Sequence, residues 1–581
     1  MAPRIYTSDS PAIPLTKTSV FTRLFAPRAA GDIGGFPADK PAFVDPSGAT
    51  LTRAQLRDIS LALGYGILNH PALASQRGET VLLHSPNCLA YPVVVFGCIS
   101  AGLRCTLANS GYVTQELAHQ YQDSGANVIF TSEEGVKTVR AMFAELGISK
   151  AEGDKRTVVI NRDLRWAGGS AAAAVSGCAG MVTFAELLTM GALQKEENFD
   201  GLLADETTFL CYSSGTTGKP KGVETTHTNM VSILDIVGPS WPRLPPGQET
   251  ILGFLPMYHM YSLAFIVHLP FTLGWQVLVQ PKFDPIQFCA SIEKFRVALA
   301  LIVPPILVVL ARHPAVDQYD VSSLQYMLSG AAPLAGDLVK QVQLRLSTRR
   351  ADGARCKITQ SYGLTETTTS THFLPFDGAD RKMGSIGPVV ANVEARIVVD
   401  EDGNVDAADG APGELWVRGK AVMKAYLNNT AATEQAFTGD GWFKTGDVVV
   451  RDSDGCFYIV DRKKELIKYR GFQVPPAELE SVLLTHPDIA DAAVIGVESA
   501  AEATELPRAY VVHAHPHNLP TPDARRAFAN GVAKWMESKV AKHKFLRGGV
   551  RVIDVIPKSP TGKILRRELR TLAKQETVAR L

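Results

Sequence analysis

Length, composition and charge set the first limits on this chain. Its 581 residues are too many for one simple core, and 46% hydrophobic with 20% charged residues is ordinary for a globular protein of two or more domains. Fifty-nine Lys and Arg residues against 58 Asp and Glu residues give a net charge of +1. No overall field therefore recruits nucleic acid or an anionic membrane, and we expect neither as a partner.

Three further features concern the compartment. None of the eight cysteines forms a C-x-x-C pair, which argues against a zinc site and a disulfide framework and favours a reducing compartment. The N-terminus, MAPRIYTSDSPAIP, has no apolar core of a signal peptide. The longest apolar runs, such as residues 298–311, are too short and too interrupted by proline to span a membrane.

Residues 80–131 alternate between strand and helix patterns. The expected order is strand 80–84, buried helix 89–102, strand 103–108, amphipathic helix 114–125 and strand 127–131. This βαβαβ order predicts a parallel sheet covered by helices. The alternation returns between about 275 and 372, where strand–helix pairs at 298–313 and 324–346 carry prolines at or near the helix starts.

The pattern changes after residue 390. Short β-rich runs at 393–400, 413–419 and 456–461 predict a small antiparallel subdomain. A compact unit follows, with helix 476–486, strands 489–497 and 508–514, helix 522–541 and strand 550–556. We place a boundary near 461–464, which gives a domain of residues 1–461 and a domain of residues 462–581.

The segment YSSGTTGKPKG, residues 212–222, follows the apolar run TTFLCY. It could be a flexible linker, but linkers do not usually emerge from a buried strand or end in Lys-Pro-Lys-Gly. Its glycines let N–H groups turn inward, its hydroxyls donate hydrogen bonds and its lysines bring charge, which together suit phosphate. The spacing differs from G-x-x-x-x-G-K-[ST], because only two residues separate Gly215 from Gly218. The segment therefore predicts a nucleotide site that is not an ordinary P-loop.

Seven further strings follow it in a fixed order. They are LPMYHMYSL (255–263), SGAAPL (329–334), QSYGLTE (360–366), GELWVRG (413–419), GWFKTGD (441–447), DRKKELIKYRGFQVPPAELE (461–480) and PKSPTGKILRR (557–567). Together the eight strings resemble the adenylate-forming superfamily, and most closely its 4-coumarate–CoA ligases and their fungal relatives. The resemblance runs from about residue 40 to 570.

The resemblance implies a fold and an activity. The fold is α/β, with a large N-terminal domain of stacked αβα subdomains plus a small β-rich subdomain, and a small mobile α+β C-terminal domain. The activity is ATP-dependent ligation of a carboxylic acid to coenzyme A through an acyl-adenylate, with Mg²⁺ as cofactor. After adenylation the C-terminal domain rotates to a second face for the thiol step.

The resemblance also assigns the ATP site. The phosphate loop consists of Ser213, Ser214, Gly215, Thr216, Thr217, Gly218 and Lys219. Glu366 is the expected magnesium ligand, since Mg²⁺ is held by one or two carboxylates plus phosphate oxygens. Tyr362 suits adenine, whose π-surface aromatic rings cover well, and Asp447 with Arg462 would contact the ribose. The remaining nucleotide and coenzyme A positions are Ala331, Gln360, Thr365, Lys468, Gly471 and Gln473.

Three residues are expected to act in catalysis. Lys563, in the turn PTGK, would bridge the carboxylate and the α-phosphate and stabilise charge that develops in the transition state. The alternative is a surface lysine, because residues 534–574 hold twelve Lys and Arg residues against three Asp and Glu residues. His259 would lie near the acyl carboxylate, although a lone histidine in an apolar run is more often a core residue. Lys464 matches the hinge.

The acid itself stays open at this stage. The positions expected to line its pocket are Tyr258, Tyr261, Ser262, Gly330, Ser361, Gly363 and residues 367–370. Ser361 replaces the first glycine of the usual Q-G-Y-G string, and Thr-Thr-Thr-Ser follows Glu366 where the plant enzymes tend to be apolar. An aryl acid and a medium-chain fatty acid are equally compatible with this pattern.

Three alternatives from other classes share most of these motifs. A luciferase-like oxidase would form the same adenylate and then use O₂. A carrier-loading adenylation domain would usually lie beside a carrier domain. A non-catalytic paralogue that binds an acyl-adenylate would be expected to lose Lys563, Glu366 or Asp447, and all three are present.

The last three residues, Ala579, Arg580 and Leu581, resemble the S-K-L peroxisomal address. The alternative is the chance end of a basic tail. We therefore expect the protein in the peroxisome or the cytoplasm.

Overall fold

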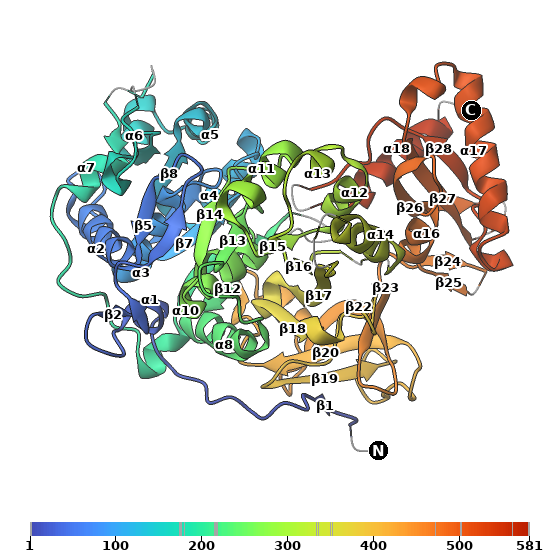
Figure 1. Ribbon diagram of the computed structural model, residues 1–581, viewed down its shortest axis with the longest axis horizontal. Coiled ribbons are helices and arrows are strands. Elements are labelled where there is room, and N and C mark those ends of the chain that lie inside the picture. The colour runs from blue at the N-terminus through green and yellow to red at the C-terminus, as the bar shows by residue number, and fades with distance from the viewer. Residues whose placement is uncertain are drawn as a thin grey trace.

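The computed structural model describes residues 3–172, 177–178, 180–213, 219–332, 334, 336–348, 350, 353–470, 472–499, 502, 504–559 and 562–578. A large N-terminal part holds two eight-stranded sheets and a five-stranded sheet, and a smaller C-terminal part lies at one end of the molecule (Figure 1). This confirms the α/β fold with a large and a small domain.

The first eight-stranded sheet has the order β10-β9-β8-β6-β7-β11-β12-β21. Its strands are β6 Thr80–His84, β7 Arg104–Ala108, β8 Ala126–Ser132, β9 Thr157–Ile160, β10 Val182–Thr183, β11 Thr207–Ser213, β12 Lys221–Thr226 and β21 Ala425–Tyr426. Strand β6 pairs in parallel with both β7 and β8, as the βαβαβ pattern predicts. Strands β11 and β12 form an antiparallel hairpin that flanks the phosphate-loop string.

The second eight-stranded sheet has the order β18-β17-β16-β15-β13-β14-β4-β5. Its strands are β4 Pro41–Val44, β5 Thr50–Thr52, β13 Thr250–Gly253, β14 Gln276–Val279, β15 Leu299–Ile302, β16 Tyr326–Ser329, β17 Lys357–Leu364 and β18 Thr369–Phe373. Strands β13 to β17 pair in parallel, with β14 at one side of β13 and β15 at the other. Site motifs therefore follow the carboxyl ends of β16 and β17, the edge where open α/β sheets bind ligands.

The helices of the N-terminal part connect and cover these strands (Figure 1). They are α1 Val20–Phe25, α2 Arg53–Asn69, α3 Ala90–Ser100, α4 Thr114–Ser124, α5 Val136–Glu145, α6 Lys150–Lys155, α7 Phe184–Leu188, α8 His227–Val237, α9 Met260–Ser262, α10 Leu269–Leu273, α11 Pro285–Phe295, α12 Pro304–Arg312, α13 Ala315–Gln318, α14 Gly336–Ser347 and α15 Thr430–Ala436. Helix α3 is apolar on every side and fully buried, whereas α11 begins at Pro285 behind the N-cap Asp284. A π-helix at Leu263–His268, which the sequence pattern did not indicate, continues α9.

The five-stranded sheet is antiparallel, as predicted for the β-rich segment. Its order is β1-β19-β20-β22-β23, with β1 Tyr6–Thr7, β19 Val393–Val398, β20 Gly413–Gly419, β22 Phe443–Arg451 and β23 Phe457–Arg462. A short hairpin of β2 Asp32–Ile33 and β3 Phe36–Pro37 stands apart. The register of β22 and β23 places Asp447 directly opposite Arg462.

The C-terminal part is an α+β unit. It contains the hairpin β24 Ile467–Tyr469 and β25 Phe472–Val474, the sheet β26 Ile489–Ser499, β27 Thr504–His513 and β28 Gly549–Val552, and helices α16 Pro476–Leu483, α17 Pro522–Glu537 and α18 Arg566–Val578. Several sequence boundaries in this unit were wrong: helix α16 ends at Leu483 rather than 486, and strand β27 begins at Thr504 rather than 508. The last strand ends at Val552 rather than 556, where Asp554 pairs with Arg525 of α17. Helix α17 ends at Glu537 rather than 541.

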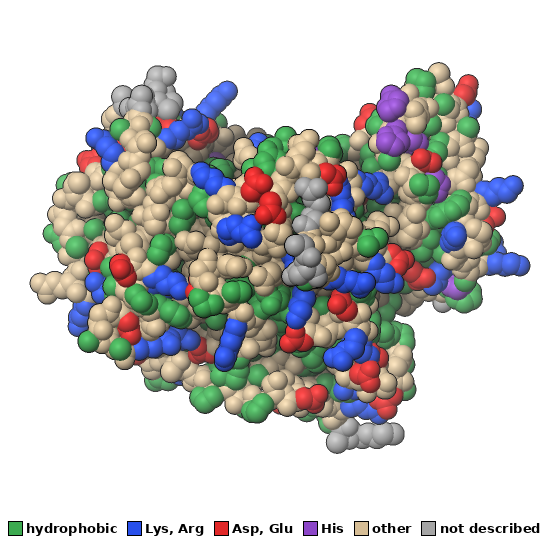
Figure 2. Space-filling view, viewed as in Figure 1, with side chains coloured by type: hydrophobic (Ala, Val, Ile, Leu, Met, Phe, Trp, Pro, Cys, Tyr) green, Lys and Arg blue, Asp and Glu red, His purple; other side chains and the backbone are tan. Residues whose placement is uncertain are grey.

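The main hydrophobic core joins the three sheets of the N-terminal part and is separate from the clusters of the C-terminal part. The main cluster runs from Val20 to Phe457, and separate clusters that pack the C-terminal sheet run from Ile467 to Ala573. Within the described residues, no helix has the length and apolarity needed to cross a membrane. Acidic and basic side chains are interspersed over the face shown in Figure 2, in keeping with the balanced net charge.

One glycine of the site motifs is required by close packing. A Cβ atom placed on Gly363 would lie 1.3 Å from the carbonyl oxygen of Thr369. We expect Gly363→Ala to lower the free energy of unfolding by about 3 kcal/mol, because the β17–β18 connection must move. Denaturant unfolding measures this loss.

The matched control is Gly531→Ala in α17, where a Cβ atom would meet no described atom within 4 Å. There alanine should raise the free energy of unfolding by about 0.5–1 kcal/mol through helix propensity. Equal stability of the two variants would contradict the role assigned to close packing at Gly363.

Candidate active site

Tyr362, Asp447 and Arg462 form the centre of the site. The Tyr362 hydroxyl donates to Asp447 Oδ2 at 2.6 Å, and Arg462 Nε lies 3.0 Å from Asp447 Oδ1. Asp447 is 4% exposed, and its negative charge raises the pKa of Arg462. Burial, together with the Asp447 charge, holds the pKa of Tyr362 well above its ordinary value. The phenol therefore stays protonated and the ring is held in one orientation by the carboxylate.

Glu366 lies in the 3₁₀ turn Thr365–Thr367 that follows β17 and is 8% exposed. Its Oε1 atom accepts a hydrogen bond of 2.9 Å from the Tyr426 hydroxyl, and its backbone carbonyl accepts from the Met423 amide at 2.7 Å. Lys221 Nζ lies 3.8 Å from the centroid of the Tyr426 ring. Neither Lys221 nor Tyr426 was predicted as a site residue: Lys221 belongs to the phosphate-loop string, but nothing in the sequence marks Tyr426.

Lys563 reaches this cluster from the C-terminal part. Gly562, the residue before Lys563, lies against the start of α12: a Cβ atom on Gly562 would lie 3.3 Å from Pro305 Cγ and 3.4 Å from Val303 Cγ2. Gly562 therefore contacts the N-terminal part.

The charges around Lys563 locate its ammonium group. Burial lowers the pKa of Lys563 to about 8, and the positive charge of Arg462 contributes to the lowering, while Asp447 and Glu366 act in the opposite direction. These are the residues to which the family resemblance assigns ATP and magnesium. The structure thus brings the predicted lysine to the predicted nucleotide residues across about 100 to 200 residues of sequence.

His259 is the N-cap residue of helix α9. Its Nδ1 atom accepts a hydrogen bond of 3.3 Å from the Tyr261 amide. Burial lowers the pKa of His259 to about 4, and the nearby positive charge of Lys563 contributes. The imidazole is therefore neutral at physiological pH. The structure places it beside Lys563, as expected for a residue near the acyl carboxylate.

Tyr261 and Gly330 lie against each other. The Tyr261 hydroxyl donates to the Leu328 carbonyl at 3.0 Å, and a Cβ atom on Gly330 would come within 3.1 Å of the Tyr261 ring. Ser262 is 1% exposed, and burial raises the pKa of Tyr258. Tyr261 and Gly330 thus form a close aromatic contact, and glycine permits this approach at the end of β16.

Ser361 is fixed in a polar contact between β17 and β18. Its hydroxyl donates to the His372 carbonyl at 3.1 Å and is hydrogen-bonded to the Ser370 hydroxyl. A glycine at position 361 would lack both interactions. The serine that replaces the usual glycine at position 361 therefore has a hydrogen-bond partner, Ser370, on the neighbouring strand β18.

The threonines after Glu366 have a different role in the structure. The Thr367 hydroxyl donates to the Thr369 carbonyl at 2.7 Å, and the Thr368 hydroxyl donates to the Ala421 carbonyl at 2.7 Å. Both residues are fully buried, and Thr368 and Thr369 adopt positive φ angles of 47° and 84°. These two hydroxyls stabilise a strained turn. By contrast, Thr369 Oγ1 is buried without a hydrogen-bond partner among the described residues.

The remaining predicted residues fall into four groups. Gln360 holds backbone groups of Leu334 and Ser385 through its side-chain amide. Ala331, at φ +68°, and Thr365 follow the carboxyl ends of β16 and β17. Lys219, Lys464, Lys468 and Gln473 are exposed, with Lys468 opposite Gln473 on the β24–β25 hairpin. Ser214, Gly215, Thr216, Thr217, Gly218 and Gly471 lie outside the described residues.

The side chains at this site fit ATP with a divalent cation. Ser213 Oγ, at the end of β11, is buried with no hydrogen-bond partner in the described part of the chain and could donate to a phosphate oxygen. Lys221, Arg462 and Lys563 supply positive charge for a triphosphate. The Glu366 carboxylate supplies the hard oxygen ligand that Mg²⁺ prefers beside phosphate.

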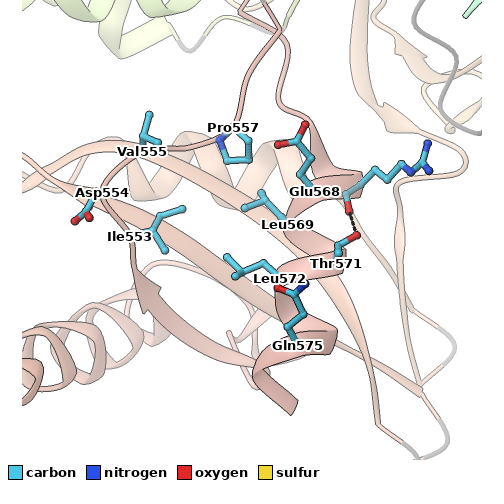
Figure 3. A pocket seen from close by; sticks show the side chains of 10 residues that line it. Ile553, Asp554, Val555, Pro557, Glu568, Leu569, Thr571, Leu572 and Gln575 are labelled. Carbon is cyan, nitrogen blue, oxygen red and sulfur yellow. Dashed lines mark hydrogen bonds between the residues drawn. The ribbon is translucent and has the colours of Figure 1, made fainter. Parts of the chain in front are cut away.

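A separate groove of about 710 Å³ lies on the C-terminal part. Figure 3 shows it between the loop after β28 and helix α18, where Ile553 and Leu572 point toward one another. Its lining includes none of the predicted site residues that the structure describes. The groove is therefore distinct from the cluster around Lys563.

Comparison with known proteins agrees with this geometry. The family model for AMP-binding enzymes matches residues 32–427, and the model for the AMP-binding enzyme C-terminal domain matches residues 478–563. The chain is 35% identical over 539 residues to 4-coumarate-CoA ligase 1 of Narcissus pseudonarcissus, covering 92% of this chain and 91% of the relative.

Solved structures with the same fold include o-succinylbenzoate CoA synthetase from Bacillus subtilis. Its complex with the acyl-adenylate OSB-AMP matches with a TM-score of 0.72 and 26% identity, over 92% of this chain and 95% of that chain. Its complex with ATP and magnesium ion matches with a TM-score of 0.73 and 24% identity, over 95% and 99%. The chain therefore belongs to the AMP-binding enzyme family, the adenylate-forming ligases that its sequence motifs resemble.

Proposed function

We propose that the protein is an AMP-forming acid–CoA ligase that joins a carboxylic acid to coenzyme A through an acyl-adenylate. The observation that carries this proposal is the position of Lys563, which the C-terminal part carries within electrostatic range of Asp447 and Glu366 of the N-terminal part and of Arg462 at the end of β23. A cation at that place suits a reaction between two anions, ATP and a carboxylate.

The first half-reaction forms the adenylate. A carboxylate oxygen attacks the α-phosphorus, the bond from the α-phosphorus to the bridging oxygen breaks, and pyrophosphate leaves with the electron pair. Lys563 stabilises the charge that develops, and Tyr362, fixed by Asp447, positions the adenine. Mg²⁺, held by Glu366, would neutralise phosphate charge. Neutral His259 adds no charge beside the attacking carboxylate.

The second half-reaction needs Lys563 to leave. We place the domain boundary at 461–462 and the hinge at Lys464. The two residues that flank Lys464 are bound to different parts of the protein. Lys463 pairs with Glu414 of β20 at 3.1 Å, whereas Glu465 pairs with Arg570 of α18 at 2.5 Å. Rotation about Lys464 would present the β24–β25 hairpin. The thiol of coenzyme A then loses its proton, its sulfur attacks the acyl carbon and AMP leaves.

The acid belongs to the aryl or medium-chain class. The named relative is a 4-coumarate ligase, and at 35% identity it supports an aryl acid. The Tyr261 wall, with glycine at position 330, would accommodate a flat ring or an extended chain. A coupled assay of the purified protein with ATP, coenzyme A and a panel of cinnamic, benzoic and medium-chain fatty acids tests the function. AMP formation that requires both an acid and coenzyme A supports it, and its absence with every acid would refute it.

Lys563→Ala should separate the two half-reactions. We expect the adenylation step to slow by on the order of 3 kcal/mol, about 100-fold, because a preorganised cation is lost. Thioester formation from supplied acyl-AMP should change far less. Single-turnover assays of each half-reaction measure the difference, and equal losses would contradict the two-arrangement scheme.

The lowered pKa of Lys563, about 8, provides an independent test of its role in adenylation. A lysine with a lowered pKa loses its charge as the pH rises through that value, so kcat/KM for ATP should fall above about pH 8. Lys563→Arg keeps its charge at every such pH. The alkaline fall should therefore shift upward or vanish in this variant.

Ser361→Gly should change the choice of acid. It removes the hydroxyl that bonds Ser370 and the His372 carbonyl, and so alters one predicted wall of the pocket. We expect the ratio of kcat/KM between acids to change by about tenfold, which alters their ranking, while the KM for ATP stays nearly constant. A uniform loss over all acids would argue against a pocket role.

We further propose a peroxisomal address at residues 579–581, the sequence Ala-Arg-Leu. An N-terminal fusion to a fluorescent protein should give punctate fluorescence in cells that becomes diffuse when Leu581 is deleted. Diffuse fluorescence from both fusions would instead place the enzyme in the cytosol.

A further inference from the structure

Glu366 is held by a side chain that no sequence motif marks. The Tyr426 hydroxyl donates to Glu366 Oε1 at 2.9 Å, and both residues are nearly buried, with Tyr426 7% and Glu366 8% exposed. One carboxylate oxygen is thus satisfied by the protein. Within the part of the chain that the structure describes, no hydrogen bond reaches the Oε2 atom, so it is left for another partner, and the orientation of the carboxylate is fixed.

Tyr426 is itself rigidly placed. It lies in β21, where the register sets it opposite Val223 of β12, and its amide donates to Thr433 Oγ1 at 3.0 Å. The residues just before Tyr426 also hold the backbone of Glu366, because the Met423 amide donates a hydrogen bond to the Glu366 carbonyl. Segment 423–426 therefore holds Glu366 by both its main chain and its side chain.

Lys221 completes the arrangement. Its ammonium nitrogen lies 3.8 Å from the Tyr426 ring centroid, within cation–π range. A cation over a phenol ring withdraws electron density and makes its O–H a stronger donor. Lys221 is also the first residue of β12, the strand that leaves the phosphate-loop string. The chain of contacts Lys221–Tyr426–Glu366 thus joins that strand to the carboxylate.

We infer that Tyr426 is a positioning residue for Glu366: its hydroxyl holds one carboxylate oxygen and leaves the other for the magnesium ion of Mg·ATP. The inference rests on the proposed function, since it assigns Glu366 to the metal. Tyr426 acts through Glu366 rather than by touching ATP or the acid. Its ring provides the surface on which Lys221 rests.

Tyr426→Phe removes the hydroxyl and keeps the ring under Lys221. The ratio of ATP affinity with Mg²⁺ to that in EDTA, measured by calorimetry, should fall by about tenfold, because a buried hydrogen bond to a charged group is lost. Affinity in EDTA should change little. The half-saturating Mg²⁺ concentration for adenylation should rise in parallel, with the KM for the acid unchanged.

Tyr458→Phe is the matched control. It deletes another phenol–carboxylate hydrogen bond, from Tyr458 to Asp452 Oδ2 at 3.1 Å, on the β-rich sheet. In this variant the ratio of ATP affinity with Mg²⁺ to ATP affinity in EDTA should stay unchanged. A double-mutant cycle adds a second check: in a Glu366→Gln background, Tyr426→Phe should have little further effect on that ratio.

The outcomes separate the inference from the proposed function. If the wild-type protein binds ATP no better with Mg²⁺ than in EDTA, the assignment of Glu366 and with it the proposed function are in error. If the wild type shows the magnesium effect and Tyr426→Phe keeps it, only the inference is overturned. A loss of ATP affinity that is equal with and without Mg²⁺, with a lowered Tm, would show a merely structural role and would also overturn it.

Discussion

The desolvation of Lys563 near a second cation, Arg462, is the constraint on which the site depends. Both cations are partly buried, and burial, followed by the Arg462 charge, lowers the pKa of Lys563 to about 8. Such a pair is tolerated because Asp447 and Glu366 lie beside it, and because the site is suited to a triphosphate. Each of these residues needs its own support. Asp447 is held by Tyr362 and Arg462, and Glu366 is held by Tyr426.

The supporting elements come from every part of the fold. Strand β17 provides Tyr362 and the turn that carries Glu366, the β22–β23 ladder provides Asp447 and Arg462, and the C-terminal part provides Lys563. The candidate site is therefore assembled at a junction of separate units. This arrangement suits the proposed two-step reaction, because one unit could withdraw a single cation without disturbing the predicted adenine and ribose residues. Catalysis of this kind depends on position and charge more than on covalent chemistry.

Close packing limits the space around the residues predicted to line the acyl pocket. Gly363 cannot accept a side chain, Gly330 lies against the Tyr261 ring, and two buried threonine hydroxyls stabilise a turn with positive φ angles. The polar string after Glu366 thus has two functions: part of it holds the backbone, and Ser370 bonds Ser361. A polar sequence in a pocket motif does not by itself indicate a polar substrate.

The sequence by itself determined the α/β class, the order of strands and helices and the family, because hydrophobic periodicity and the glycine-rich strings are local patterns. It also predicted Lys563, Glu366, Tyr362 and Asp447 as site residues through their motifs. Only the tertiary structure decided which residues meet. Tyr426 follows Glu366 by 60 residues and lies in a two-residue strand, so no local pattern could pair them. The end of the last strand at Val552 and the π-helix at Leu263–His268 likewise depend on neighbouring elements, because long-range packing, rather than local propensity, sets where they begin and end.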